Sequence, residues 1–302
     1  MTGTYQKSEP DAFSSYHPLL LFFYFGVVLF FCMFFLHPVL LMISICSGFF
    51  YSILLNGRKA LKFNACMLPV AGAVALMNPL FNHAGVTILF YLNNNPVTLE
   101  SIVFGIIYAL AFFSVILTFS CFNRIMTSDK LMYLFGRLIP ILSLMFSMTL
   151  RFVPRYKAQL KKITDAQKCI GMDPSYGSLL RRIKNGVQII SILITWALEN
   201  AIESADSMRA RGFGQKGRSS FSVFSWKKRD KVLLLSEAFL ACILLSGLAL
   251  EKYKSSYIPM IHISGLNGAG IPFYLAYALF CLTPVIADCK EELVWNRLKS
   301  AD

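Results

Sequence analysis

The sequence predicts an all-α membrane protein with about six transmembrane helices and one helical domain outside the membrane. Hydrophobic residues make up 56% of the 302 residues and charged residues 15%, whereas a soluble domain contains about 45–50% and about 25%. The apolar residues gather in runs long enough to cross about 30 Å of hydrocarbon as helices. The formal net charge is +13, and most of the basic residues lie in one segment between these runs. Together these observations exclude a soluble globular protein.

Six apolar runs have close to the ~20 residues that a transmembrane helix needs. The first two are separated only by His37 and Pro38, which predicts a tight helical hairpin, and we expect Pro69 and Pro79 to interrupt the third. For the apolar segment 86–92 two alternatives stay open: it dips into the membrane, or it lies on the surface as a strand. The six runs are 19–36, 39–55, 63–81, 101–122, 232–250 and 271–289.

The positions of Lys and Arg predict the orientation of the spans. The loop after the second run carries Arg58, Lys59 and Lys62, whereas the loop 82–98 carries no Lys or Arg, and residues 123–230 contain nineteen basic and seven acidic residues. Because cytoplasmic loops are rich in Lys and Arg, we expect the basic segments and both termini in the cytoplasm. The expected domains are a transmembrane part of about four spans (1–122), a cytoplasmic domain (123–230) and a transmembrane part of about two spans with a short tail (231–302).

The cytoplasmic segment divides into amphipathic helices. Ser128–Leu138 is the first, and residues 139–148 either continue it or dip into the membrane interface. We expect a break at 151–154 and then two helices, 155–169 and 176–211, whose apolar residues recur every three or four positions. These two helices could pack as a pair, and we expect the partner helix to cover part of the apolar stripe of the second. That stripe consists of Leu179, Leu180, Ile183, Val187, Ile190, Ile194, Ala197, Leu198 and Ala201.

Both long helices end in a glycine, Gly171 and Gly212. Glycine just past a helix end supplies a left-handed cap, and arginine in the last turn is favoured by the helix dipole. The segment 209–211, Arg-Ala-Arg, is therefore either a solvated cap or a contact for a partner.

The residues show no catalytic, nucleotide or metal motif. The segment 214–220 has the wrong spacing for a phosphate-binding loop and follows a helix instead of preceding one. No two cysteines form a Cys-x-x-Cys pair, and all of the eight except Cys169 lie in or beside apolar runs, as buried thiols do. The spans contain only Glu237 and Asp288 as charged residues, so a catalytic site or polar pathway within them has little support. Four histidines lack metal-ligand spacing: His17, His37, His83 and His262.

We therefore expect a non-catalytic protein that binds no cofactor, metal or nucleic acid. Its basic residues lie around helices that also carry wide apolar stripes, a pattern that anionic lipid headgroups and an acidic protein partner explain better than nucleic acid. The alternative is a membrane-embedded enzyme or a stand-alone carrier with a basic cytoplasmic domain.

From about residue 101 to 218 the chain resembles the transmembrane T component of energy-coupling factor (ECF) transporters, the EcfT/CbiQ-like family, which includes the membrane subunit of cobalt and nickel uptake systems. The resemblance is strongest at 150–154 (Leu-Arg-Phe-Val-Pro) with 165–168 (Asp-Ala-Gln-Lys), and at 205–212 (Ala-Asp-Ser-Met-Arg-Ala-Arg-Gly). In that family two cytoplasmic coupling helices each end in Ala-Arg-Gly. Their arginines dock into grooves on two ATPase subunits, and their apolar surfaces hold a small membrane protein, the substrate-binding S component.

The resemblance implies a scaffold and coupling subunit for vitamin or metal-ion uptake in the cell membrane of a prokaryote, with ATP bound only by the partner subunits. It implies an S-component surface at Val187, Ile190, Ile194 and Leu198. It implies ATPase-coupling residues at Arg209, Ala210, Arg211 and Gly212 and, in the first helix, at Cys169, Ile170 and Gly171.

The sequence departs from the family pattern in two places. Ile170 stands where the first motif has arginine, and isoleucine cannot replace a planar, bidentate guanidinium. The first ATPase contact is then hydrophobic, or Lys168 supplies a charge from a turn away, or that subunit binds differently. Residues 16–18, Tyr-His-Pro, replace the Asp-Pro-Arg-Thr-Lys segment usual before the first span.

Overall fold

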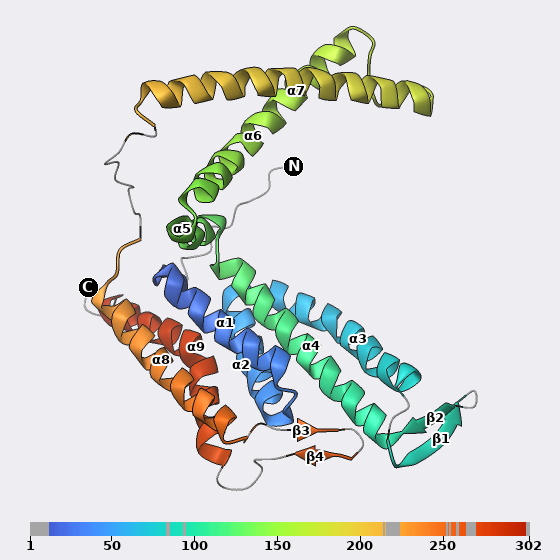
Figure 1. Cartoon of the computed structure of the whole chain (residues 1–302), viewed down its shortest axis with the longest axis vertical. Coiled ribbons are helices and arrows are strands. Elements are labelled where there is room, and N and C mark those ends of the chain that lie inside the picture. Colours follow the sequence, from blue (N-terminus) through green and yellow to red (C-terminus); the bar gives the residue numbers. More distant parts are fainter. Residues whose placement is uncertain are drawn as a thin grey trace. The chain divides into compact units, whose positions relative to one another are not determined.

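The computed structural model describes residues 12–82, 85–92, 95–213, 215, 224–251, 253, 255–257, 260–263 and 270–299. The chain divides into two compact units (Figure 1), and each is described by itself. The membrane unit comprises Met1–Lys130 with Phe224–Asp302, and the helical unit comprises Leu131–Val223.

The membrane unit is a bundle of long apolar helices, which confirms the predicted all-α membrane fold. Five helices of the described chain are long and apolar enough to cross a membrane, and a sixth apolar helix, α1, has 17 residues. Each predicted run therefore coincides with one helix. The helices of this bundle are α1 (Pro18–Phe34), α2 (Pro38–Asn56), α3 (Arg58–Phe81), α4 (Leu99–Ile125), α8 (Lys228–Ala249) and α9 (Ile271–Lys299).

The predicted interruption of the third span is wrong, because α3 runs unbroken through Pro69 and Pro79. A proline inside a helix removes one hydrogen bond. In hydrocarbon a broken helix would expose more unpaired backbone groups than that single one, so the continuous helix is the better solution. The helix also begins earlier than predicted, at Arg58, and its charged first turn precedes the apolar part.

Two short antiparallel hairpins lie outside the helices. Strand β1 (Ile88–Leu92) pairs with β2 (Asn95–Thr98), and β3 (Ser255–Ser256) pairs with β4 (His262–Ile263). For the apolar segment 86–92 the structure thus selects the strand alternative.

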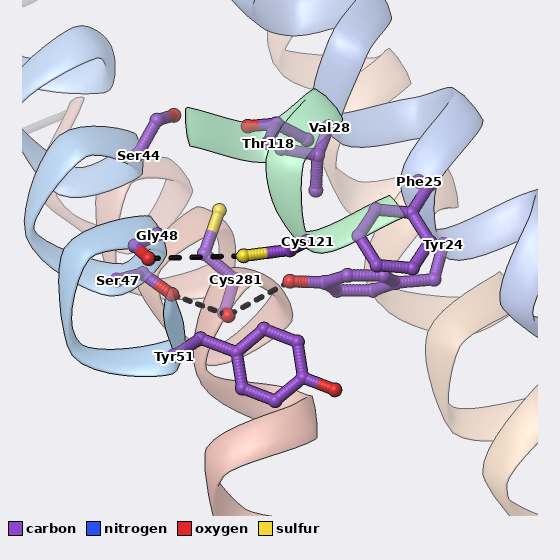
Figure 2. A pocket seen from close by; sticks show the side chains of 10 residues that line it. All are labelled: Tyr24, Phe25, Val28, Ser44, Ser47, Gly48, Tyr51, Thr118, Cys121 and Cys281. Atoms are coloured by element: carbon purple, nitrogen blue, oxygen red, sulfur yellow. Dashed lines mark hydrogen bonds between the residues drawn. The ribbon is translucent and has the colours of Figure 1, made fainter. Parts of the chain in front are cut away.

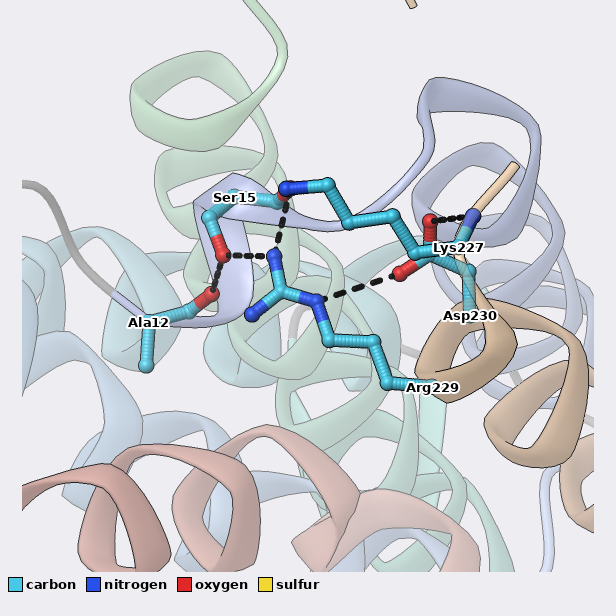
Figure 3. A network of polar contacts seen from close by, with 5 residues as sticks. All are labelled: Ala12, Ser15, Lys227, Arg229 and Asp230. Atoms are coloured by element: carbon cyan, nitrogen blue, oxygen red, sulfur yellow. Dashed lines mark hydrogen bonds and ion pairs between the residues drawn. The ribbon is translucent and has the colours of Figure 1, made fainter. Parts of the chain in front are cut away.

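A short helical turn near the N-terminus, η1 (Phe13–Ser15), ties several helix ends together. The Arg229 guanidinium at the start of α8 donates to the carbonyl and the Oγ of Ser15, at 3.2 and 2.8 Å (Figure 3). The Lys130 ammonium donates to the Ser14 carbonyl at 2.7 Å and to the Ile125 carbonyl at 2.9 Å. The two places where the chain leaves and re-enters the membrane unit are therefore anchored on one turn, which we call the N-terminal junction (Phe13–Tyr16 with Lys130 and Arg229).

The aromatic ring of Tyr16 completes this junction. The Arg229 guanidinium lies 4.8 Å from the centre of the ring. Burial raises the pKa of the Tyr16 phenol above its ordinary value of 10.0, against the opposing effect of Arg229. The phenol therefore stays neutral at physiological pH.

The helical unit contains α6 (Pro140–Cys169) and α7 (Leu179–Ala210), preceded by α5 (Ser128–Leu138). The predicted break at 151–154 is wrong: α6 continues through Pro154. Residues 140–148 form the first part of α6 and do not extend α5. Ring stacking between Phe152 and Tyr156, at 5.9 Å, bridges the two sides of Pro154 and helps to keep the helix continuous.

Candidate functional site

Helices α6 and α7 cross (Figure 1). They pack through aromatic and polar side chains. The Tyr156 ring meets the edge of Trp196 at 5.5 Å between ring centres, and the Arg155 guanidinium lies 5.5 Å from the same indole. Ile163 of α6 and Ile189 of α7 are buried. The crossing therefore has enough large side chains to hold the two helices at a defined angle.

The buried face of α7 is not the apolar stripe predicted from the sequence. Asn185, Ile189 and Asn200 are buried, and their spacing of four and eleven residues places them on one side of the helix. The Asn185 side-chain amide donates to the carbonyl of Asp173 at 3.2 Å, which fixes the turn between the helices. The expectation that α6 covers part of the apolar stripe is therefore wrong for the large side chains of the stripe.

Those large side chains are exposed. Val187, Ile190, Ile194 and Leu198 keep 53% to 62% of their surface accessible. The stripe also extends further than the sequence interpretation had it, to Ile202, four residues after Leu198 and equally exposed. The i, i+4 spacing could have shown this. A continuous exposed apolar surface of this kind marks a contact with a protein or a membrane. The exposed stripe consists of Leu179, Leu180, Ile183, Val187, Ile190, Ile194, Leu198 and Ile202.

The C-terminal ends of α6 and α7 have the same backbone geometry. Gly171 and Gly212 both have φ +77°. At the first end the Gly171 N–H donates to the Lys168 carbonyl and the Met172 N–H to the Gln167 carbonyl. The Gly212 N–H donates to the Arg209 carbonyl and the Phe213 N–H to that of Met208. This is the Schellman arrangement, in which a left-handed glycine closes the helix.

The shared cap aligns the two ends residue by residue. Ile170 and Arg211 are both the cap residue just before the glycine. Cys169 then corresponds to Ala210, and Lys168 to Arg209. Lys168 therefore corresponds to the basic residue Arg209 at the second end. Arg211, in contrast, corresponds to Ile170, so the first end has no basic residue at that position.

Lys168 is also poorly placed to replace an arginine at position 170. Residues two apart on a helix point to nearly opposite sides, since each residue turns by about 100°. The Lys168 ammonium lies 4.0 Å from the Asp165 carboxylate, and both side chains are half exposed. Such a surface pair contributes about 0–1 kcal/mol.

The two ends present different chemistry to a partner. Arg209 and Arg211 are exposed on the second end. On the first end Ile170 is 64% exposed, and Met172, two residues later, is exposed too. Both ends carry one basic residue in the last turn, but the cap position is cationic at the second end and apolar at the first.

The interior of the membrane unit holds polar groups beside a small cavity. The Tyr24 hydroxyl and the Ser47 Oγ both donate to the Cys281 carbonyl, at 3.0 and 2.5 Å (Figure 2). The cavity beside them measures ≈ 10 Å³, about the room that one water needs. Glu237 of α8 is fully buried, and its two carboxylate oxygens have no hydrogen-bond partner within the described residues. In the described part of the chain, no three His, Cys, Asp or Glu side chains gather into a group that could hold a metal ion.

Comparison with known proteins gives matches over most of the chain. The family of the cobalt transport protein CbiQ matches residues 15–223. A protein of Lactobacillus helveticus named energy-coupling factor transporter transmembrane protein EcfT is 30% identical over 221 residues, 67% of this chain and 76% of that protein. The EcfT of Bacillus subtilis is 31% identical over 180 residues, 56% of this chain and 68% of that protein. That of Lactococcus lactis subsp. cremoris is 34% identical over 105 residues, and the match spans only 40% of its length.

Proposed function

Because the chain belongs to the CbiQ family, whose members include the EcfT transmembrane proteins of ECF transporters, we propose that it is the scaffold and coupling subunit of an ATP-driven micronutrient importer. Membership confirms the resemblance seen in the sequence, and the apolar helices make the chain a multi-pass membrane protein. The observation that carries the proposal is the pair of equivalent capped helix ends, at Ile170–Gly171 and Arg211–Gly212.

Each helix end is the docking point for one cytoplasmic ATPase subunit. Arg211 projects from the C-terminus of α7, where the helix dipole favours a cation and where its planar fork can reach a carboxylate of the partner. Arg209 is a supporting contact. Ile170 makes the corresponding contact at the end of α6 through apolar surface.

The crossed helices transmit the movement. Since the Tyr156–Trp196 contact and the buried Ile163 and Ile189 lock α6 on α7, a displacement of either end moves the other helix with it. The exposed stripe of α7, with Val187, Ile190, Ile194 and Leu198, is then the surface that holds the S component. That subunit selects the substrate, a vitamin or a metal ion.

The N-terminal junction gives this movement a fixed base. The chain leaves the membrane unit after Lys130 and re-enters it before Arg229, and both residues hydrogen-bond to Ser14 or Ser15. The two connections therefore start from one anchored point of the membrane unit.

Affinity purification of the tagged full chain from its native host tests the proposal. We expect two ATPase subunits and one small membrane protein to purify with it, and we expect ATP hydrolysis to disappear when the ATPases are removed, because the chain has no phosphate-binding loop. An unrelated tagged membrane protein of the same host is the control. ATPase activity that stays with the isolated chain, or a complex without any ATPase, would refute the proposed role.

A further inference from the structure

The β1–β2 hairpin between α3 and α4 carries apolar side chains on both of its faces. Leu89, Phe90 and Tyr91 follow one another along β1 and are exposed by 54%, 52% and 67%. Phe90 is opposite Val97 and Tyr91 opposite Pro96 in the ladder. Val97 is buried, whereas these side chains of β1 are exposed. Because consecutive side chains of a strand point to opposite faces, β1 presents apolar side chains on both of its faces.

The hairpin is held firmly against the start of α4. The Leu99 N–H donates to the Thr87 carbonyl at 3.0 Å, which continues the hairpin into the helix. The Thr87 hydroxyl donates to the Glu100 carboxylate at 2.6 Å, and the Thr87 N–H donates to the same group. The exposed apolar faces are therefore part of an ordered structure.

Such a hairpin would be unstable and prone to aggregation if it were surrounded by water. A two-stranded hairpin is marginally stable in water at best, and exposed apolar strands promote aggregation. The whole connection 82–98 contains no Lys, Arg, Asp or Glu that could keep it in solution.

The neighbouring helix places the hairpin at the edge of the bilayer. The last basic residue of α3 is Lys62, and the apolar part from Phe63 to Phe81 spans roughly 27 Å at 1.5 Å per residue, close to the ~30 Å of the hydrocarbon. Leu80 and Phe81 at the end of α3 are themselves exposed. The apolar surface thus continues from the lipid-facing end of α3 onto the hairpin.

We propose that the β1–β2 hairpin lies in the lipid interface of the leaflet opposite to the one in which α3 begins, with the exposed side chains of β1 in contact with lipid. Aromatic residues such as Phe90 and Tyr91 are suited to this position, and Tyr in particular is enriched at membrane–water interfaces. The hairpin then acts as an anchor that sets the depth of α3 and α4 in the bilayer. The proposal needs only a membrane-embedded chain and does not depend on the ATPase or S-component contacts.

Fluorescence quenching at single positions tests the location. In a variant of the full chain without its eight cysteines, a cysteine is placed at position 90 or 91, labelled with the environment-sensitive dye NBD and reconstituted in nanodiscs. The lipid reference is position 235, an exposed leucine of α8, and the water reference is position 203, an exposed glutamate of α7. Gel filtration confirms that each labelled variant is folded and monodisperse.

We expect lipids with a nitroxide near the headgroup to quench the dye at positions 90 and 91 several-fold more strongly than at position 203. Aqueous iodide should quench the dye at these positions no more than at position 235. Quenching of either probe by iodide and not by the lipid nitroxide would overturn the proposal. The same is true if the probes become shielded only after the co-purified partner proteins are added, since a protein would then be the occupant.

Discussion

The asymmetry between the two capped helix ends makes a quantitative prediction about Arg211. Its side chain is exposed, and an exposed substitution changes folding stability by only about 0.5 kcal/mol or less. Truncating one partner of a desolvated charge pair at an interface costs about 2–5 kcal/mol. At 1.4 kcal/mol per factor of ten, Arg211→Ala should weaken the binding of one ATPase roughly 30-fold to several-thousand-fold.

Ile170→Ala should have a smaller effect. Full burial of an isoleucine side chain is worth about 1.5–3 kcal/mol, and Ile170 has 64% of its surface left to bury. Truncation then costs about 1–2 kcal/mol, a weakening of roughly 5- to 30-fold. Ile170→Arg restores the family motif, but we expect it to impair binding, because the exposed Ile170 and Met172 favour an apolar groove on the partner.

The assay is a pull-down of each ATPase with these three variants, together with uptake of the substrate in cells. Lys184→Ala is the matched control, since Lys184 is an exposed cation of the same helix that lies far along the chain from its C-terminal end, and the variant should bind both ATPases as the unmodified chain does. The reasoning fails if Arg211→Ala leaves both ATPases bound and uptake intact. It also fails if Ile170→Arg binds its ATPase more tightly than the unmodified chain does, because the groove would then have kept a carboxylate.

Two further predictions concern topology and the helix caps. A cysteine at Ser256 in a cysteine-free background should react with an impermeant reagent from outside the cell, and one at Gln215 only after permeabilisation; the reverse pattern would contradict the orientation drawn from Lys and Arg. Gly171→Ala and Gly212→Ala should each lower the free energy of unfolding by about 1–2 kcal/mol, because alanine is strained at φ +77°. Gly186→Ala, within α7 and with free space around it, should instead raise the free energy of unfolding by about 0.5–1 kcal/mol. Denaturant unfolding of the purified protein measures all three variants. Equal effects at the three glycines would disprove the cap argument.

Features that depend on residues close together in the chain could be predicted from the sequence. Apolar runs of about 20 residues predicted the spans, because hydrocarbon leaves a helix as the only way to pair the backbone of one segment. Glycine after the last helical turn predicted the ends at Gly171 and Gly212, since the left-handed cap favours that residue. The family resemblance also rested on short motifs near these ends. All of these features depend on residues close together in the chain.

Other features depended on which segments meet in space. The sequence predicted that α7 has an apolar stripe, but only the tertiary structure shows that α6 packs on Asn185, Ile189 and Asn200 and leaves that stripe exposed. Hydrophobic periodicity predicts which face of a helix is apolar, but it does not predict which segment or partner covers that face.

The contact of Arg229 with Ser15 was likewise decided by tertiary packing. This contact joins residues 214 positions apart. The amino-acid sequence alone therefore determined the class, the spans and the capped ends of this protein. Which face of α7 stays exposed and which residues form the N-terminal junction were decided by long-range contacts, because local propensities do not specify which distant side chains become neighbours.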